Sequence, residues 1–196
     1  GFDHSRAMIP GFDHFSHLAP IYDKAMPFKA IDSLVAHSQL KGDEIVLDAG
    51  GGTGRVAEAL APYVRKVVIA DLSKGMLDQA RRKGLNTLLA PVESLPFPSD
   101  EFDRVVMTDA LHHVYDQQNA ACEMWRILSP GGMIIIQEPD IRKFSVKLVA
   151  MIEKIALMRS HFLSSSQIVG LFNNLEGEIS QVDEGFSVWT LIKKPK

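Results

Sequence analysis

Hydrophobic and polar positions follow two alternating patterns from residue 44 onward. Short runs that are almost continuously apolar are separated by segments whose apolar residues recur at helical spacing. A strand covered by helices on both faces has this continuous apolar character, and strands that alternate with helices are typical of a parallel sheet. The predicted strands are Glu44–Ala49, Lys66–Ala70, Asn86–Ala90, Phe102–Thr108 and Met133–Gln137.

Several helical segments carry recognisable end signals. Ser73 is a residue type that caps helix N-termini, and Gly84 is the type that ends helices. The run Ser129–Gly132 contains a proline and two glycines, which predicts a loop. The predicted helices are Pro27–Leu40, Thr53–Ala61, the segment from Ser73 to Gly84, Asn119–Leu128, Phe144–Phe162 and Ser164–Leu175.

Two further strand-like runs end the chain. Glu178–Val182 and Phe186–Ile192 are separated by the polar turn Asp183–Gly185, which predicts an antiparallel hairpin at the sheet edge. The predicted fold class is α/β, a doubly wound, seven-stranded, mostly parallel sheet with a C-terminal antiparallel hairpin. We expect a single domain over residues 1–196, which comprises an N-terminal arm and helix (1–43), a core (44–137), a helical cap (138–176) and the hairpin (177–196).

Composition and charge exclude several classes of protein. The 196 residues include 21 Lys and Arg against 24 Asp and Glu, for a net charge of −3, and 46% are hydrophobic. This globular composition lacks the basic excess that neutralises nucleic-acid phosphates, so we expect no nucleic-acid partner. Cys122, the single cysteine, allows no internal disulfide and no thiolate zinc site, which favours a reducing, cytoplasmic location. We expect no stable membrane anchor, because no apolar run approaches the roughly 20 residues that cross a bilayer.

The strongest chemical signal lies where the first predicted strand ends. That strand runs directly into four glycines within residues 50–54. Ligands of doubly wound sheets bind outside the carboxyl ends of the strands, and glycines let the backbone approach a ligand closely. Asp71 ends the second predicted strand, 21 residues after Gly50, where a carboxylate can accept the hydroxyl hydrogens of a ribose. Together these features predict a nucleoside cofactor.

Two other interpretations of the glycines remain open on the residues alone. The dinucleotide pattern G-x-G-x-x-G/A fits Gly52, Gly54 and Ala57, but it begins two residues late and leaves Asp48 without a role. An NAD-dependent reductase of the Tyr-x-x-x-Lys type is also disfavoured, because none of the three tyrosines has a lysine four residues later. A tight turn without a ligand would not need four glycines, which cost folding entropy.

Several motifs in order resemble one family. Asp48–Gly54 resembles the D-x-G-x-G-x-G motif of class I S-adenosylmethionine-dependent methyltransferases, and Asp71 matches their ribose-binding acid. The segments 93–97, 102–106, 111–114 and 126–132 resemble successive signatures of the small-molecule branch. Residues 15–23 resemble the F-x-x-x-A-x-x-Y-D opening of the ubiquinone/menaquinone-biosynthesis C-methyltransferases. The resemblance implies S-adenosylmethionine as cofactor and the seven-stranded methyltransferase fold.

The resemblance also implies roles for individual residues. The glycines would shape the loop under the methionine moiety, Asp48 would lie near its ammonium group, and Asp71 would hold the ribose. Pro91 departs from the family, which often has an aspartate there for the adenine amino group. The implied cofactor-binding residues are Tyr22, Asp48, Gly50, Gly52, Gly54, Asp71, Leu72, Met76, Val92, Glu93 and Asp109.

The function implied is transfer of a methyl group from S-adenosylmethionine to a small, apolar or aromatic acceptor by in-line displacement. If the acceptor arrives protonated, Asp109 and His113 are the candidate bases, with cofactor binding or helix capping and a pocket-wall role as their respective alternatives. His112 is interpreted as a packing or surface residue. No metal site is expected, because adjacent residues such as His112 and His113 do not face one another on a regular element. A non-catalytic S-adenosylmethionine-binding module or partner subunit is the alternative from another class, and a homodimer stays open.

Overall fold

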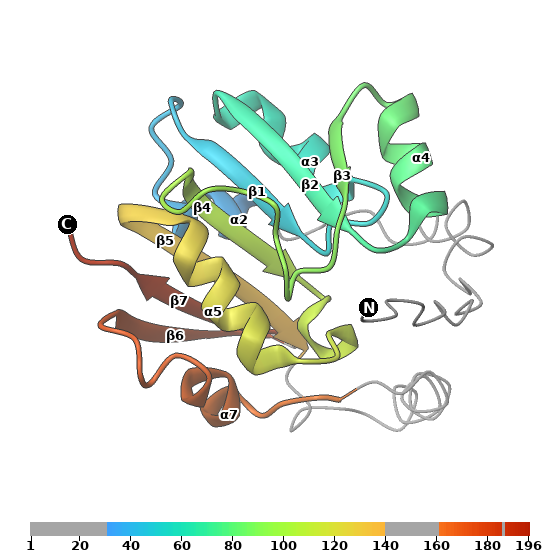
Figure 1. Ribbon diagram of the computed structural model, residues 1–196. Coiled ribbons are helices and arrows are strands. Elements are labelled where there is room, and N and C mark those ends of the chain that lie inside the picture. The colour runs from blue at the N-terminus through green and yellow to red at the C-terminus, as the bar shows by residue number, and fades with distance from the viewer. Residues whose placement is uncertain (1–30, 140–160, 186) are drawn as a thin grey trace, which may run out of the picture.

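A computed structural model describes residues 31–139, 161–185 and 187–196. Its centre is one seven-stranded sheet with the strand order β3-β2-β1-β4-β5-β7-β6 (Figure 1). The first five strands along the chain are parallel and the last two are antiparallel, which confirms the predicted fold class. The strands are β1 (Ile45–Ala49), β2 (Lys66–Asp71), β3 (Asn86–Leu89), β4 (Phe102–Thr108), β5 (Leu128–Pro139), β6 (Glu178–Glu184) and β7 (Ser187–Lys193).

The strand order reverses between β1 and β4. From β1 the chain proceeds through β2 to β3 at one edge, and it then returns to β4 on the other side of β1. Both neighbours are parallel to β1, with Leu47 opposite Val68 of β2 and Val105 of β4. The carboxyl ends of β1 and β4 therefore flank the crevice in which doubly wound sheets bind ligands.

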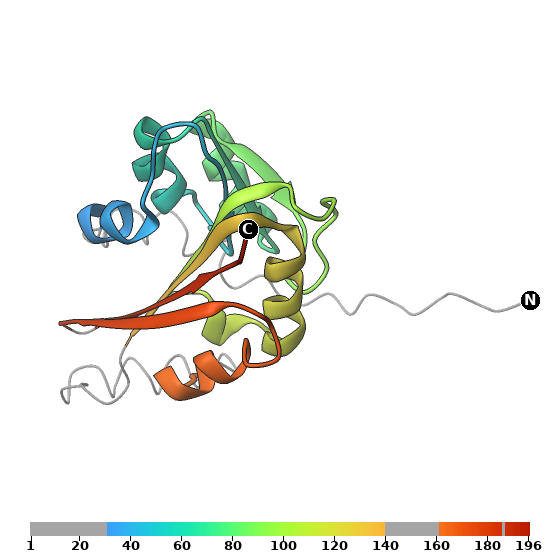
Figure 2. The ribbon, with the colours of Figure 1, turned by 90° about the vertical axis from the view of Figure 1, so that its left-hand side faces the viewer.

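Helices cover both faces of the sheet. Figure 2 shows α2 and α5 on opposite faces. Side chains alternate accordingly along β1: Val46 packs in the cluster with α2, α3 and α4, whereas Leu47 packs in the cluster with α5 and α7. The helices are α2 (Ile31–Ser38), α3 (Arg55–Leu60), α4 (Lys74–Arg82), α5 (Gln117–Ile127) and α7 (Ser165–Gly170), with the 3₁₀ helices η1 (Ala61–Tyr63) and η2 (Leu111–His113).

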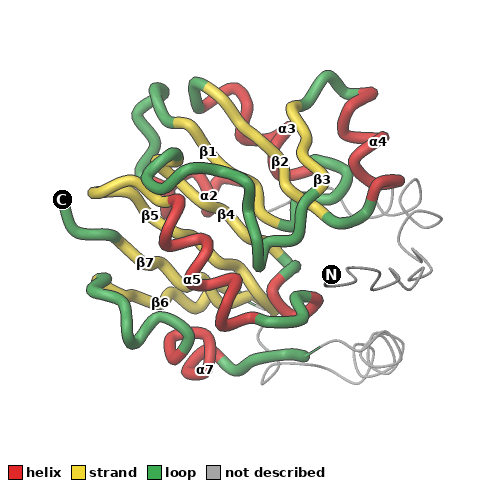
Figure 3. Tube along the Cα trace, in the orientation of Figure 1, coloured by secondary structure: helices red, strands yellow, loops and turns green. Residues whose placement is uncertain are grey.

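The C-terminal hairpin adds two strands beyond β5, with β6 at the sheet edge opposite to β3 (Figure 3). β7 pairs with β5 on one side and with β6 on the other, so Leu191 lies opposite both Ile135 and Ser180. The turn is shorter than predicted. Asp183 and Glu184 belong to β6, and Gly185 at φ 60° follows them.

β5 is the element that differs most from its prediction. It spans twelve residues, Leu128–Pro139, and begins directly after α5. The predicted loop at Ser129–Gly132 is instead an irregularity within the strand, because Phe102 pairs with Leu128 while Arg104 pairs with Met133. Proline and glycine interrupt the regular pairing here without ending the strand.

Helix ends also differ from the sequence expectations. α3 begins at Arg55 instead of Thr53, because Gly54 has a left-handed conformation and forms the N-cap. It ends at Leu60, where Pro62 takes part in η1. α7 begins as predicted after Ser164, whose side chain accepts from the N–H of Gln167 in a capping box, but it ends at Gly170.

Some predictions fall outside the described residues. Tyr22 and the start of the predicted helix Pro27–Leu40 lie there, as does almost all of Phe144–Phe162. The described end of that second segment, residues 161–162, is not helical. In the part of the chain that the structure describes, no helix is both long and apolar enough to cross a membrane.

Candidate functional site

The loop between β1 and α3 is shaped by positions that accept no side chain. Gly50 has φ 71° and donates its N–H to the carbonyl oxygen of Ala70 at 2.7 Å. A Cβ atom on Gly50 would lie 2.8 Å from the Cβ atom of Ala110, and one on Gly54, at φ 79°, would lie 2.9 Å from Ile69 Cδ1. Glycine is favoured at both positions because positive φ values strain other residues. The loop therefore packs directly against the segment that follows β4.

Asp71 ends β2 beside this loop. Its Oδ2 atom accepts a hydrogen bond from the N–H of Gly52 at 2.9 Å, and its Oδ1 atom accepts one from the N–H of Ser73 at 2.7 Å. Each carboxylate oxygen has a second lone pair, so these bonds fix the carboxylate and leave it able to accept ribose hydroxyls. The structure thus brings Asp71 and the glycine loop together.

Asp48 lies beneath the loop and is 1% exposed. Its Oδ2 atom accepts from the N–H of Ala57 at 3.2 Å, while Oδ1 finds no partner among the described residues. Burial raises the pKa of Asp48 to about 7. An unpartnered buried carboxylate oxygen costs about 1–3 kcal/mol, and a ligand ammonium within its reach would remove that cost. The residue therefore fits the role that the resemblance implies.

The three apolar residues implied to contact adenine have different surroundings. Leu72 follows Asp71 directly and is 66% exposed. Met76 lies in the first turn of α4, where its sulfur would be 3.1 Å from a Cβ atom on Gly52. Val92 is buried in the core cluster. Leu72 and Met76 thus lie next to the carboxylate and the loop that are implied to hold the rest of a nucleoside.

Glu93 is already engaged with the segment that precedes α5. Its Oε1 atom accepts hydrogen bonds from the N–H groups of Tyr115 and Asp116 at 3.1 and 3.3 Å. Its carbonyl oxygen accepts from Asn119 Nδ2 at 2.7 Å. The carboxylate and the carbonyl group of Glu93 thus fix the loop before α5 and its first turn. Glu93 is the nearest carboxylate in sequence that could replace the missing aspartate at Pro91, and one of its two oxygens is engaged by backbone amides.

Asp109 follows β4 in an unusual conformation, with φ 50°. A left-handed aspartate of this kind costs about 1–3 kcal/mol and persists where its surroundings hold it. Its N–H donates to the carbonyl oxygen of Gln137 at 2.9 Å, and its Oδ2 atom lies 4.0 Å from Nη2 of Arg55. Burial, and next the charge of Glu138, raise the pKa of Asp109 to about 6, against the opposing charges of Arg55 and His112.

His112 and His113 have opposite surroundings on η2. His112 is buried, its Nδ1 atom lies 2.6 Å from Oε2 of Glu138, and its ring stacks on Phe162 at 4.3 Å between centroids. His113 is exposed, with its ring centroid 4.1 Å from that of His112. Burial and the neighbouring His112 lower the pKa of His113 to about 4, although solvent contact at an exposed side chain weakens such shifts. His112 is therefore a packing residue, whereas His113 is accessible to a ligand.

The family described as "Methyltransferase domain" matches residues 47–136, which include the glycine loop, Asp71, Asp109 and both histidines. Residues 47–136, which are 90 of the 196 residues, are therefore similar to this family. This match covers the switch point of the sheet and every strand from β1 to most of β5.

Known proteins resemble the chain at two levels. It is 36% identical over 118 residues to the ubiquinone/menaquinone biosynthesis C-methyltransferase UbiE of Coxiella burnetii, which covers 55% of this chain and 47% of that protein. The chain thus spans about half the length of this curated relative. A SAM-dependent methyltransferase from Thermotoga maritima superposes with a TM-score of 0.76 at 23% identity, covering 93% of this chain and 97% of that one. The [4+2]-cyclase SpnF superposes with a TM-score of 0.74 at 15% identity, covering 92% and 93%. At these identities, the two structures show a shared fold alone.

Two residues near the site, Glu138 and Arg55, were not predicted from the sequence. Glu138 follows the apolar run of β5 as Asp71 ends that of β2, so its place at a strand end was a usable signal. Arg55 follows the last glycine of the loop and carries no comparable signal. Its partner Asp109 is more than fifty residues away in the sequence, and only the fold brings the two together.

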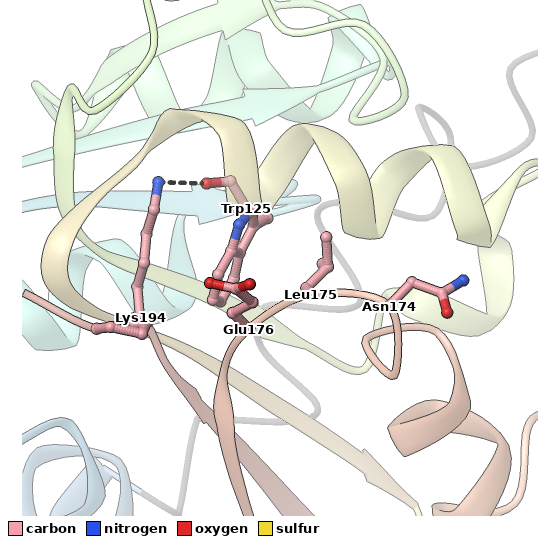
Figure 4. Close-up of a pocket in the computed structure, with 6 residues that line it drawn as sticks. Trp125, Asn174, Leu175, Glu176 and Lys194 are labelled. Carbon is pink, nitrogen blue, oxygen red and sulfur yellow. Dashed lines mark hydrogen bonds between the residues drawn. The ribbon is translucent and has the colours of Figure 1, made fainter.

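A pocket of about 390 Å³ lies beside the end of α5, next to the segment before β6 and the segment after β7 (Figure 4). Trp125, Leu175 and Glu176 line it together with Lys194. The Nζ atom of Lys194 donates to the carbonyl oxygens of Trp125 and Leu128 at 3.1 and 2.6 Å, and to Asp100 Oδ1 at 2.9 Å. Lys194 therefore fastens the segment after β7 to the end of α5.

Across residues 31–139, 161–185 and 187–196, no group of three or more His, Cys, Asp or Glu side chains is arranged to hold a metal ion. His112 and His113 contact one another through their rings, and Nδ1 of His112 is engaged by Glu138.

Proposed function

We propose that the chain transfers a methyl group from S-adenosylmethionine to a small, apolar or aromatic acceptor. The observation that carries this proposal is the contact between the glycine loop and the segment after β4, with Asp71 on one side and Asp109 on the other. This arrangement supports the proposal, because a carboxylate that would bind the ribose and titratable groups lie together at the switch point of the sheet, within the residues that match the methyltransferase family.

The residues at the switch point fit the cofactor. Asp71 would hold the ribose hydroxyls, and the backbone of Gly50–Gly54 would lie under the methionine moiety. The unpartnered oxygen of Asp48 would receive the ammonium group. Leu72 and Met76 would flank the adenine ring. When bound, S-adenosylmethionine supplies a methyl group activated by a positively charged sulfur.

The protein's own contribution is orientation, exclusion of water and, for a protonated acceptor, proton removal. Asp109 is the better base of the two candidates, because its pKa of about 6 exceeds that of His113, about 4. At pH 7 Asp109 is therefore an ionised carboxylate able to accept a proton. His113 is neutral at that pH and can form a hydrogen bond with the acceptor without a charge.

The acceptor class is the finer part of the proposal. Similarity to UbiE of Coxiella burnetii, a C-methyltransferase by name, supports methylation at carbon. The exposed imidazole of His113, neutral at pH 7, suits an aromatic or apolar molecule with few charges. A cytoplasmic location and a single domain over residues 1–196 remain part of the proposal.

The alternative is a protein that binds S-adenosylmethionine without turnover. It is favoured by one observation, the absence at Pro91 of the usual acidic partner for adenine together with the engagement of Glu93 elsewhere. The structural likeness to a cyclase also shows that this fold does not fix the chemistry.

Two measurements test the proposal. Isothermal titration should detect binding of S-adenosylhomocysteine and no comparable binding of NAD; stronger binding of NAD would contradict it. Transfer of a radiolabelled methyl group should then be detected with a panel of small phenols and hydroquinones. Tight cofactor binding without any transfer would favour the non-catalytic alternative.

A further inference from the structure

Glu138 lies at the end of β5 and is 5% exposed. Its Oε1 atom accepts hydrogen bonds from the N–H groups of Ala110 and Leu111 at 3.0 and 2.8 Å. Its Oε2 atom lies 2.6 Å from Nδ1 of His112. One buried carboxylate thus contacts three consecutive residues of the segment after β4.

An ionised Glu138 side chain can accept a hydrogen bond from each of these three groups, with the hydrogen of the His112 bond on Nδ1. Hydrogen bonds to a charged group are stronger than neutral ones, and they offset the cost of burying the charge.

The segment held in this way connects Asp109 to His113. Asp109 immediately precedes Ala110, and its strained left-handed conformation is fixed from both directions. Its own N–H is bonded to the carbonyl oxygen of Gln137, the residue before Glu138. Ala110 in turn packs on Gly50 of the cofactor loop.

We propose that Glu138 is a positioning residue, which holds the backbone of residues 110 and 111 and the His112 ring so that Asp109 stays beside Arg55 and Ala110 stays against the glycine loop. This inference rests on the proposed function, since it assigns Asp109 to the cofactor site. Glu138 itself need not touch the cofactor, because it acts through two backbone amides and the His112 ring.

Two variants separate geometry from charge. In Glu138→Gln, the amide oxygen can accept from both backbone N–H groups and the NH₂ group can donate to Nδ1 of His112, so the positions are kept and the charge is lost. Glu138→Leu removes both the hydrogen bonds and the charge. Glu123→Leu is the matched control, because Glu123 also accepts from a backbone amide, that of Leu95, and pairs with Arg126 on α5.

The first readout is binding of S-adenosylhomocysteine by titration calorimetry. At pH 8 we expect Glu138→Gln to bind within about threefold of the wild type, and Glu138→Leu to lose about tenfold, the effect of one buried hydrogen bond. Glu123→Leu should bind like the wild type. A folded Glu138→Leu variant with wild-type affinity would overturn the inference.

The second readout is the pH dependence of that binding, which a purely structural role would not move. Asp109 faces Arg55 from α3, His112 from η2 and Glu138 from β5, and Glu138 is the largest charge effect on its pKa. We expect wild-type affinity to fall below about pH 6, and its midpoint to shift to lower pH in Glu138→Gln. If Glu138→Leu does not fold, the midpoint measured for Glu138→Gln tests the proposal. A midpoint equal to that of the wild type contradicts it.

Amide hydrogen exchange separates this inference from the proposed function. Without any cofactor, the N–H groups of Ala110 and Leu111 should exchange faster in Glu138→Leu than in the wild type. If they do while the wild type fails to bind S-adenosylhomocysteine, the proposed function fails and the role of Glu138 in holding the segment stands. If the wild type binds but the two exchange rates are unchanged, the inference fails alone.

Discussion

The two halves of the site use carboxylates in different ways. On the β1 and β2 side, Asp48 and Asp71 accept hydrogen bonds from backbone N–H groups of the loop and of the helix starts. On the β4 and β5 side, Asp109 faces Arg55, and Glu138 binds a histidine as well as two backbone amides. The first half is built by local chain geometry, and the second by side chains from distant parts of the sequence.

This difference separates recognition from protonation. A carboxylate fixed by backbone amides presents a rigid acceptor for a ligand's hydroxyl groups. A carboxylate among other ionisable groups changes its pKa when any neighbour changes charge. We therefore expect substitutions in the β1 and β2 half to alter folding and cofactor affinity, and those in the β4 and β5 half to alter both cofactor affinity and its pH dependence.

The largest expected effect concerns the loop itself. Gly54→Ala should lower the free energy of unfolding by about 3 kcal/mol, because the new Cβ atom combines a left-handed backbone with contacts to Leu85 and Ile69. Gly84→Ala is the control. It has a similar φ of 80° but nothing within 4 Å, so only the backbone cost of about 1 kcal/mol applies. Urea denaturation measures both, and equal losses would show that packing around the loop contributes nothing.

Asp71→Ala should weaken binding of S-adenosylhomocysteine by about tenfold to hundredfold, since the half-buried carboxylate proposed to accept the ligand's hydroxyl hydrogens is lost and Gly52 and Ser73 lose a partner. Asp78→Ala removes an exposed carboxylate on α4 that pairs with Lys74 and Arg81, and should leave the affinity unchanged. Titration calorimetry at pH 8 compares them. Comparable affinities for the two variants would remove Asp71 from the cofactor site.

The β4 and β5 half predicts opposing pH effects on stability. The raised pKa of Asp109, about 6, means that the folded protein holds this proton more tightly than the unfolded chain, so protonation of Asp109 stabilises the fold as pH falls from 6. The lowered pKa of His113, about 4, has the opposite sign, and its stabilising contribution is lost as pH falls from 6.5 toward 4.

Substitution of one titratable group should therefore reveal the effect of the other on the pH dependence of stability. Between pH 6 and 4, stability should fall more steeply in Asp109→Asn than in the wild type, by up to about 1.4 kcal/mol per pH unit, and less steeply in His113→Gln. The His113 effect should be the smaller one, because water screens an exposed ring. Urea denaturation across this range measures the slopes. Parallel curves for all three proteins would show that neither pKa is shifted.

The smallest effect is expected outside both halves. Lys194→Met should lower stability by about 1 kcal/mol through its lost hydrogen bonds, with no change in S-adenosylhomocysteine affinity. Thermal unfolding and calorimetry give the two values. A change in S-adenosylhomocysteine affinity would mean that the segment after β7 is energetically coupled to the site.

The local half of the site could be predicted from sequence, because its causes are local. A buried strand that runs into glycines predicts the turn, and Ser73 predicts the start of α4, where its hydroxyl accepts from the N–H of Met76 at 3.4 Å. Asp71 is identified by its position at a strand end, 21 residues after Gly50 in the sequence. None of these inferences requires a contact between distant segments.

The other half depends on pairing between strands. Glu138 meets residues 110–112 only because β5 lies beside β4, with Gln137 opposite Thr108. The length of β5 was also hidden, since the proline and glycines at residues 130–132 predict a loop in isolation. Pairing with β4 and β7 keeps that stretch within the strand.

The position of β7 has a consequence for synthesis on the ribosome. β7 is the last strand along the chain, yet it lies inside the sheet and covers the outer edge of β5. A nascent chain that has emerged only as far as β6 would leave that β5 edge unpaired, because β6 contacts the sheet only through β7. Unpaired edges are sites of aggregation. The nascent chain therefore depends on β7 to protect this edge, and a chain that stalls before residue 193 would expose the β5 edge to aggregation.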